Sequence, residues 1–186
     1  MEAKKIAQHA LEFIGGQPTV NAYYNEDESK SIDIMECKEN NSEDTTIATI
    51  GLSAFDIAKT TEDGKDLRVE LLMAGLAGTD VFGQILSQVA FEIQDMGDCY
   101  FGMIVENVIS PYVTQTNLRH VILMSPVFWD KYKPLLTDDT CVTWLLAVPI
   151  RDDEKDFIEK HGVDAFDEAM AKVNINVTDF LRTSCV

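Results

Sequence analysis

Hydrophobic and polar positions alternate most regularly in two runs in the first half of the chain. Over residues 45–53, Ala48, Ile50 and Leu52 share one face, and over residues 66–73 leucine, valine and methionine alternate with mostly charged side chains. A period of two over this length is typical of strands that have one face on a core and the other facing water or a partner. The polar connection between the runs is too long for a tight hairpin. The pattern therefore predicts two antiparallel strands joined by an acidic loop.

Helical periodicity is clearest over residues 79–96, where apolar residues recur at intervals of three and four. Thr79 is the expected N-cap, and a helix of about 17 residues is about 26 Å long at a rise of about 1.5 Å per residue. Its apolar stripe is expected to lie across the sheet. Three shorter helices are predicted over residues 3–14, 151–162 and 163–173.

Extended segments account for much of the remaining sequence. Residues 141–150 form a near-continuous apolar run, which indicates a strand buried on both faces. An aromatic cluster in the loop around Pro134, made of Phe128, Trp129 and Tyr132, is expected to cap one edge of the core. Further extended segments are predicted over residues 20–24, 31–37, 100–105, 108–109 and 119–124, with one more short element within residues 174–186.

Length and composition favour one folded domain. The 186 residues are 46% hydrophobic and include 9 Phe, 5 Tyr and 2 Trp, which is enough to build a sizeable core. No internal repeat, low-complexity segment or linker divides the sequence. We therefore predict a single α+β domain over residues 1–186, with a mostly antiparallel, mixed sheet and helices packed on one face, above all the helix over residues 79–96.

Export, membrane insertion and cofactor binding find no support in the sequence. The N-terminus lacks the apolar core of a signal peptide, and no run approaches the roughly 20 apolar residues of a membrane span. The 4 cysteines stand far apart without a C-x-x-C pair, and the 3 histidines belong to separate elements. Gly75-x-x-Gly78 lacks the pattern that phosphate binding needs and more simply marks a helix terminus. We expect a cytoplasmic protein with reduced thiols, no metal and no cofactor.

The charge balance is the most unusual property of the composition. The chain has 32 acidic and 15 basic residues and a formal net charge of −17. Between Asn21 and Glu70 there are 13 acidic and 5 basic residues, so the negative charge is concentrated in the strands and loops of the first half. Such a field repels nucleic acid and anionic membranes and speeds encounter with a basic partner. The simpler alternative is a solvated acidic surface that keeps the protein soluble.

Two carboxylates are candidates for catalysis. Glu70 in a strand and Glu154 at the start of a helix could form a carboxylate pair, or Glu70 could act with the neighbouring Arg68. With 32 acidic residues, some such pairing is expected by chance. No serine lies in a G-x-S-x-G motif. Enzymatic activity is therefore the least favoured of the functions considered.

An acidic surface on a rigid sheet suits the inhibition of a nuclease. The nucleic-acid groove of such an enzyme is lined with lysine and arginine, and clustered carboxylates can occupy it in place of phosphates. The alternative for each acidic residue is an ordinary solvated turn. The candidate contacts are the carboxylates of three predicted loops, Glu26, Asp27 and Glu28, then Glu62 and Asp63, then Asp138 and Asp139.

Four segments together resemble the bacterial branch of the suppressor-of-fused domain family. They are T-I-A-T-I-G-L-S at residues 46–53, L-R-V-E-L-L at 67–72, V-T-W-L-L-A-V-P-I-R-D-D-E at 142–154 and D-F-L-R at 179–182. In length and in its opening I-A-Q-H-A-L-E, the chain is similar to antitoxin or immunity members of the family that occur beside LXG-type toxins in Bacillus-like bacteria. The resemblance implies a non-enzymatic α/β or α+β binding module that inhibits a cognate toxin, frequently a nuclease.

These observations lead to one main hypothesis and one alternative. The main hypothesis is an antitoxin or immunity protein that neutralises a basic protein toxin by shape and charge, without catalysis and without contact to nucleic acid or membrane. The alternative is a non-enzymatic adaptor that holds a cytosolic regulatory protein or peptide along a sheet edge.

Overall fold

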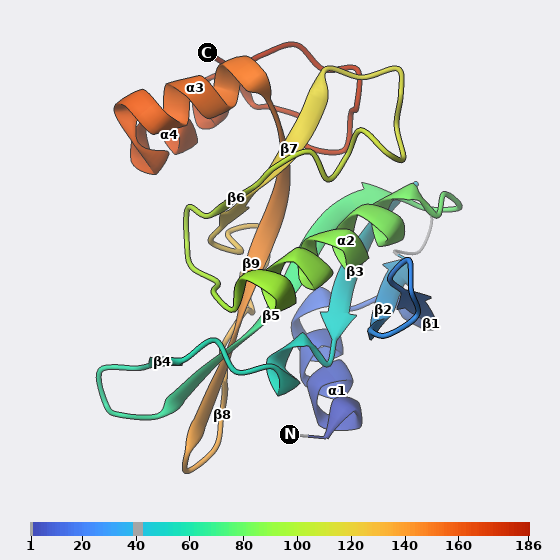
Figure 1. Cartoon of the computed structure of the whole chain (residues 1–186), viewed down its shortest axis with the longest axis vertical. Coiled ribbons are helices and arrows are strands. Elements are labelled where there is room, and N and C mark those ends of the chain that lie inside the picture. The colour runs from blue at the N-terminus through green and yellow to red at the C-terminus, as the bar shows by residue number, and fades with distance from the viewer. Residues whose placement is uncertain (1, 39–42) are drawn as a thin grey trace.

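The computed structural model describes residues 2–38 and 43–186, and within these residues nine strands form one sheet. The main path of the sheet runs β1-β2-β3-β5-β9-β7-β6, while β4 pairs with β5 and β8 pairs with β9 (Figure 1). The strands are β1 (Gln17–Tyr24), β2 (Ser31–Lys38), β3 (Asp44–Ile50), β4 (Lys59–Thr60), β5 (Asp66–Leu76), β6 (Ile104–Val105), β7 (Leu118–Met124), β8 (Leu135–Leu136) and β9 (Thr140–Arg151). The helices are α1 (Ala3–Ile14), α2 (Val81–Met96), α3 (Asp152–His161) and α4 (Val163–Val173), with a 3-10 helix η1 (Leu52–Ala54) after β3.

Strands β3 and β5 pair antiparallel, as the alternating pattern predicts. Thr45 lies opposite Gly75, and Ala48 lies opposite Leu72. The connection between them contains more structure than a plain loop, because η1 follows β3 and β4 places Lys59 opposite Leu67 at the start of β5. The predicted strand pair is confirmed, with its acidic loop shortened by these two elements.

Strand β9 is buried on both faces, which confirms the prediction from its apolar run. It lies parallel to β5 and antiparallel to β7, so the sheet is mixed as well as mostly antiparallel. Leu145 belongs to the core beneath α2, whereas Trp144 is fully buried in a second core on the opposite face. Strand β9 therefore carries side chains into both cores of the domain.

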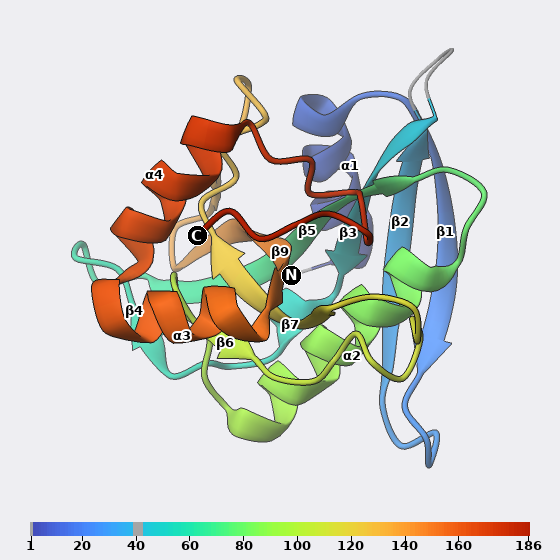
Figure 2. The same cartoon turned by 90° about the horizontal axis from the view of Figure 1, so that it is seen from above.

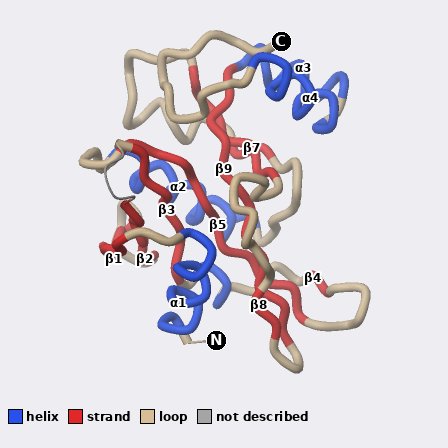
Figure 3. Tube along the Cα trace, turned by 180° about the vertical axis from the view of Figure 1, so that it is seen from behind, coloured by secondary structure: helices blue, strands red, loops and turns tan. Residues whose placement is uncertain are grey.

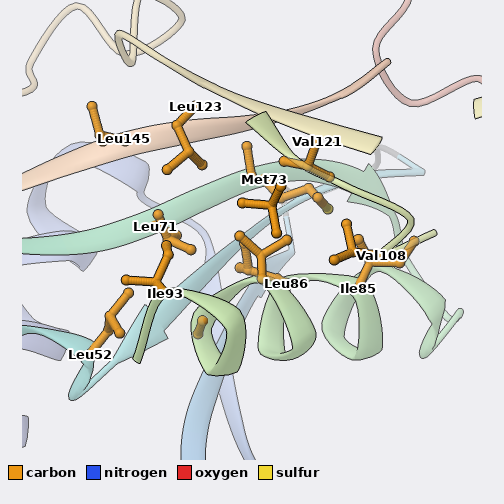
Figure 4. Close-up of a cluster of buried hydrophobic side chains, with 14 of the residues drawn as sticks. Leu52, Leu71, Met73, Ile85, Leu86, Ile93, Val108, Val121, Leu123 and Leu145 are labelled. Atoms are coloured by element: carbon orange, nitrogen blue, oxygen red, sulfur yellow. The ribbon is translucent and has the colours of Figure 1, made fainter. Parts of the chain in front are cut away.

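The helices cover both faces of the sheet. Helix α2 packs on one face, where Ile85 and Leu86 meet Leu71 and Met73 of β5 (Figure 4). Helix α1 lies on the other side of β3 and β5 (Figures 2 and 3), and its buried residues share the second core with those of α3 and α4. The prediction that helices pack on one face is therefore wrong, although the α+β class is correct. The physical reason is that β5, β7 and β9 bury side chains on both faces, so each face needs a cover.

Smaller differences concern element boundaries. Helix α2 begins at Val81 with Asp80 as its N-cap, so Thr79 is not the cap residue. The side chain of Asp80 makes no cap bond and instead accepts a hydrogen bond from the Tyr23 hydroxyl. Of the extended segments predicted between residues 99 and 124, only β6 and β7 are strands. Residues 174–186 form turns without a helix or strand.

None of the helices in the described ranges is both long enough and apolar enough to cross a membrane.

Candidate partner-binding surface

Glu70 is completely buried and is held by five hydrogen bonds. The Thr49 hydroxyl donates to Oε2 at 2.6 Å, the Ser53 hydroxyl donates to Oε1 at 2.6 Å, and the backbone N–H groups of Gly51, Leu52 and Ser53 donate at 2.9, 3.2 and 3.0 Å. Burial raises the pKa of the Glu70 carboxyl, and the hydrogen bonds from Ser53 and Thr49 oppose that shift. The carboxylate therefore fixes the turn between β3 and η1 and has no face open to a substrate.

Glu154 is also buried and pairs with Arg182. The guanidinium donates to its two carboxylate oxygens at 2.6 and 2.7 Å, and the backbone N–H groups of Arg151 and Cys185 donate at 3.0 and 3.1 Å. Burial acts to raise the pKa of Glu154, but the bonds from Arg182 outweigh it, so the pKa is lowered. This arrangement ties the C-terminal segment to the first turn of α3.

The predicted catalytic arrangements of Glu70 are not formed. Glu70 lies opposite Trp144 in the β5–β9 pair, and seven further residues of β9 separate that point from the start of α3. At about 3.3 Å per residue, Glu70 and Glu154 are more than about 20 Å apart. Arg68 pairs instead with Asp66 at 3.2 Å and with Asp56 at 3.6 Å. Both carboxylates are structural, and the two catalytic hypotheses built on them are wrong.

Four of the seven predicted contact residues lie together at one end of the molecule. The loop between β4 and β5 carries Glu62 and Asp63, and the loop between β8 and β9 carries Asp138 and Asp139; all four are exposed. Lys65 joins the loops, because its Nζ donates to the backbone carbonyls of Thr137 and Asp138, both at 2.7 Å. We call residues 61–66 and 137–140 the acidic tip (Figure 1, around β4 and β8).

Hydrogen bonds within the acidic tip keep its loops in place. The N–H of Asp66 donates to the carbonyl of Asp139 at 2.9 Å. The Thr61 hydroxyl donates to Asp63 at 2.5 Å, which lowers the pKa of that carboxyl. Lys65 is directed at backbone carbonyls, and the carboxylates of Glu62, Asp63, Asp138 and Asp139 face solvent.

The other three predicted contact residues form a separate group. Glu26, Asp27 and Glu28 are exposed in the turn between β1 and β2, at a different corner of the molecule from β4 (Figure 2). The N–H and hydroxyl of Ser29 donate to Asp27 at 3.0 and 2.6 Å, and these bonds lower the pKa of Asp27. The side chain of Lys30 turns away to pair with Asp95 of α2. The structure therefore presents two acidic groups, not one.

Two hollows in the surface were not predicted from the sequence. One is an apolar cavity of about 280 Å³ between α4 and strands β7 and β9, beside the exposed side chains of Val127 and Phe128. The other is a groove of about 670 Å³ between β1 and α2, lined in part by Tyr23, Tyr24 and Tyr112. The predicted aromatic cluster is formed only in part, because Trp129 and Tyr132 pack on the second core and Phe128 stays exposed.

The histidines, cysteines and carboxylates of the described residues form no group that could hold a metal ion. His120 illustrates the structural use of these side chains. Its Nδ1 accepts a hydrogen bond from the N–H of Asn107 at 3.1 Å, and its Nε2 lies 2.9 Å from Asp152. The exposed carboxylates of the acidic tip and of the turn between β1 and β2 remain the candidate contacts for a partner.

Comparison with known proteins agrees with this fold. The model of the family Suppressor of fused protein (SUFU) matches residues 28–183. Immunity protein YqcF of Bacillus subtilis (strain 168) is 34% identical over 188 residues, an alignment that covers 100% of this chain and 97% of that protein.

Solved structures of related folds extend over almost the whole chain. A SUFU homolog from Neisseria gonorrhoeae FA 1090 has a TM-score of 0.75 at 18% identity, covering 99% of this chain and 96% of that one. The Sufu–Fu complex has a TM-score of 0.70 at 12% identity, covering 98% and 91%. Drosophila Suppressor of Fused has a TM-score of 0.58 at 12% identity, and the match covers 94% of this chain but 45% of that longer one. Because the family model matches most of the chain and a full-length relative is 34% identical to it, the chain belongs to the suppressor of fused family.

Proposed function

We propose that this protein is an immunity protein that binds a cognate toxin and neutralises it stoichiometrically, without catalysis. The observation that carries the proposal is its 34% identity, from end to end, to an immunity protein of Bacillus subtilis. The comparisons do not favour the alternative of an adaptor for a regulatory protein.

The acidic tip supports a specific mode of action. It holds five exposed carboxylates on two loops that Lys65 and the backbone of Asp66 tie together, and four of them remain after Asp66 pairs with Arg68. Fixed carboxylates lose little conformational entropy on binding, and they can occupy sites where a nuclease would hold phosphates. The net charge of −17 adds long-range attraction to a basic surface. We infer that the toxin presents a basic nuclease domain to the acidic tip.

Co-expression tests the proposal. Candidate toxins encoded by the neighbouring genes are induced in cells with and without this protein, and growth, complex formation and nuclease activity are measured. Growth rescue with a one-to-one complex supports the proposal, whereas normal toxicity and no complex at low salt exclude it.

Charge variants test the acidic tip. The tip variant combines Glu62→Gln, Asp63→Asn, Asp138→Asn and Asp139→Asn. A matched control removes four exposed carboxylates from helices α1, α3 and α4 with Glu12→Gln, Asp156→Asn, Glu159→Gln and Glu168→Gln. The tip variant is expected to weaken binding by at least about tenfold at low salt while the control binds nearly as the native protein does. Equal weakening in both would mean that only net charge matters.

A further inference from the structure

Strand β1 is an edge strand with no partner on its outer side among the described residues. It is eight residues long, pairs with β2 without a bulge, and is exposed at every position except the half-buried Tyr23. The opposite edge of the sheet, β6, has only two residues. Exposed edges of this length are usually protected by charged side chains, bulges or proline. Strand β1 contains no charged residue, and Pro18 lies near its start.

The backbone groups that face the free edge follow from the register. Asn25 donates its N–H to the carbonyl of Lys30 at 3.2 Å, and hydrogen-bonded pairs alternate along an antiparallel ladder. Tyr23, Asn21 and Thr19 therefore bond to β2. The N–H and C=O groups of Val20, Ala22 and Tyr24 point outward, where an added strand can pair with them.

A preformed groove runs beside this edge on the α2 face. Tyr23 donates its hydroxyl to Asp80, and a Cβ at Gly83 would clash with that hydroxyl, so only glycine lets the tyrosine lie this close to the helix. Tyr112 also lines the groove and is exposed, whereas Tyr24, the next residue of β1, borders the groove with its ring directed to the other face of the strand. Tyrosine rings beside a carboxylate suit a lysine or arginine side chain, through cation–π contact and ion pairing.

The acidic side chains near the free edge of β1 favour a basic binding partner over a second copy of this chain. Asp33 and Glu36 lie across from Ala22 and Thr19 on β2, and the turn beyond β1 carries the acidic group of residues 26–28. The nearby lysines are engaged, since Lys30 pairs with Asp95 and Lys38 lies 3.9 Å from Glu36. Pairing two copies would bring together two chains that each carry a net charge of −17, which like-charge repulsion disfavours.

We propose that β1 binds an extended, lysine- or arginine-containing segment of the toxin by strand addition, with basic side chains entering the groove between β1 and α2. This inference rests on the proposed function, because the strand that β1 binds is a segment of the toxin that the protein is proposed to neutralise. Main-chain hydrogen bonds supply affinity in this mode, and the groove supplies specificity.

Hydrogen–deuterium exchange tests the proposal on the unaltered protein. The protein is compared alone and in complex with the toxin that the co-expression experiment identifies as its partner. The amides of Val20, Ala22 and Tyr24 are expected to exchange fast in the free protein and at least about tenfold more slowly in the complex. Unchanged exchange at all three in a stable complex would overturn strand addition and leave the immunity role intact. Protection that grows with protein concentration in the absence of toxin would identify a second copy as the occupant and would also overturn it.

A matched pair of variants provides the second test. Ala22→Pro removes one outward N–H and leaves the bonds to β2, a change that edge strands tolerate, whereas Ala22→Thr keeps the N–H and adds bulk. Thermal unfolding checks that both variants fold. Ala22→Pro is expected to raise the Kd for the toxin by about tenfold or more and Ala22→Thr by less than about twofold. Equal Kd values for the two would overturn the inference, and failure of the native protein to bind or rescue would reject the proposed function and the inference together.

Discussion

The guanidinium of Arg182 binds the carboxylate of Glu154 through two parallel hydrogen bonds of 2.6 and 2.7 Å. Both side chains are buried, and a third bond runs from Arg182 to the carbonyl of Pro149 at 2.8 Å. This pair holds the last residues of the chain, which form no helix or strand, against the end of β9 and the start of α3.

Removal of the arginine leaves a buried carboxylate without its counter-charge. Arg182→Met is expected to lower the free energy of unfolding by about 3–5 kcal/mol, measured by urea denaturation. Arg119 provides the control, since it is more than half exposed and lies 3.4 Å from the exposed Asp152. Arg119→Met should leave the denaturation midpoint nearly unchanged, because exposed ion pairs contribute little. A midpoint for Arg182→Met equal to that of the control would contradict the structural role of the pair.

Glu70 provides a second, independent test of buried polar structure. Glu70→Gln keeps the shape of the side chain but places an amide NH₂ against N–H and O–H donors, so the expected loss is about 2–3 kcal/mol of unfolding free energy. Glu62→Gln, which alters an exposed loop carboxylate, is the matched control and should have no measurable effect. A Glu70→Gln protein as stable as the control would show that the hydrogen bonds to Glu70 do not stabilise the fold.

The same two carboxylates give opposite dependences of stability on pH. The pKa of Glu154 is lowered in the folded protein, so its stabilising contribution is present above its ordinary value near 4.5 and is lost as the pH falls through the folded pKa. The pKa of Glu70 is raised, so its contribution is greatest below the ordinary value near 4.5 and declines as the pH rises through the folded pKa.

Variants at Arg182 separate these two contributions. Arg182→Met removes the cause of the lowered Glu154 pKa, so its loss of unfolding free energy should be larger at pH 7 than at pH 3. Urea titrations at a series of pH values measure the difference. A loss that stays constant over this range, or grows toward acid, would mean that the ion pair does not control the titration of Glu154.

These buried carboxylates explain which parts of the fold could be predicted. The alternation in β5 indicates one buried face and one solvent face, because Arg68 and Glu70 occupy the second. Glu70 is nevertheless buried, and its donors come from the end of β3 and the turn that follows, about 20 residues earlier in the chain. A charged residue therefore makes a buried face look like a surface, and for this reason the alternation predicts helices on only one face of the sheet. The longer strands and the helices are predictable because their periodicity is local, whereas the two-residue strands β4 and β8 show no periodicity.

The segments that resemble the family also have a structural explanation. The I-G-L-S and R-V-E-L segments meet at Glu70, and the segment ending at Glu154 meets D-F-L-R through Arg182. The resemblance to the family therefore lies in residues that hold the fold together, and not in the residues of the candidate partner surface. The acidic tip depends on contacts between Lys65 and residues more than 70 positions away, so the sequence predicted its carboxylates but not their proximity.

Binding kinetics should separate the acidic tip from the edge of β1. Charge attraction acts mainly on association, whereas hydrogen bonds formed in the complex act on dissociation. The tip variant is expected to lower the association rate constant by about tenfold at 0.01 M salt, where the Debye length is about 30 Å, and to differ little from the native protein at 1 M, where it is about 3 Å. Ala22→Pro is expected to raise the dissociation rate constant at both salt concentrations. Surface plasmon resonance with immobilised toxin measures both constants. A tip variant whose association rate constant stays as far below that of the native protein at 1 M salt as at 0.01 M would contradict an electrostatic role. If the Ala22→Pro effect disappeared at high salt instead, the contact at β1 would be electrostatic and not a hydrogen-bonded strand.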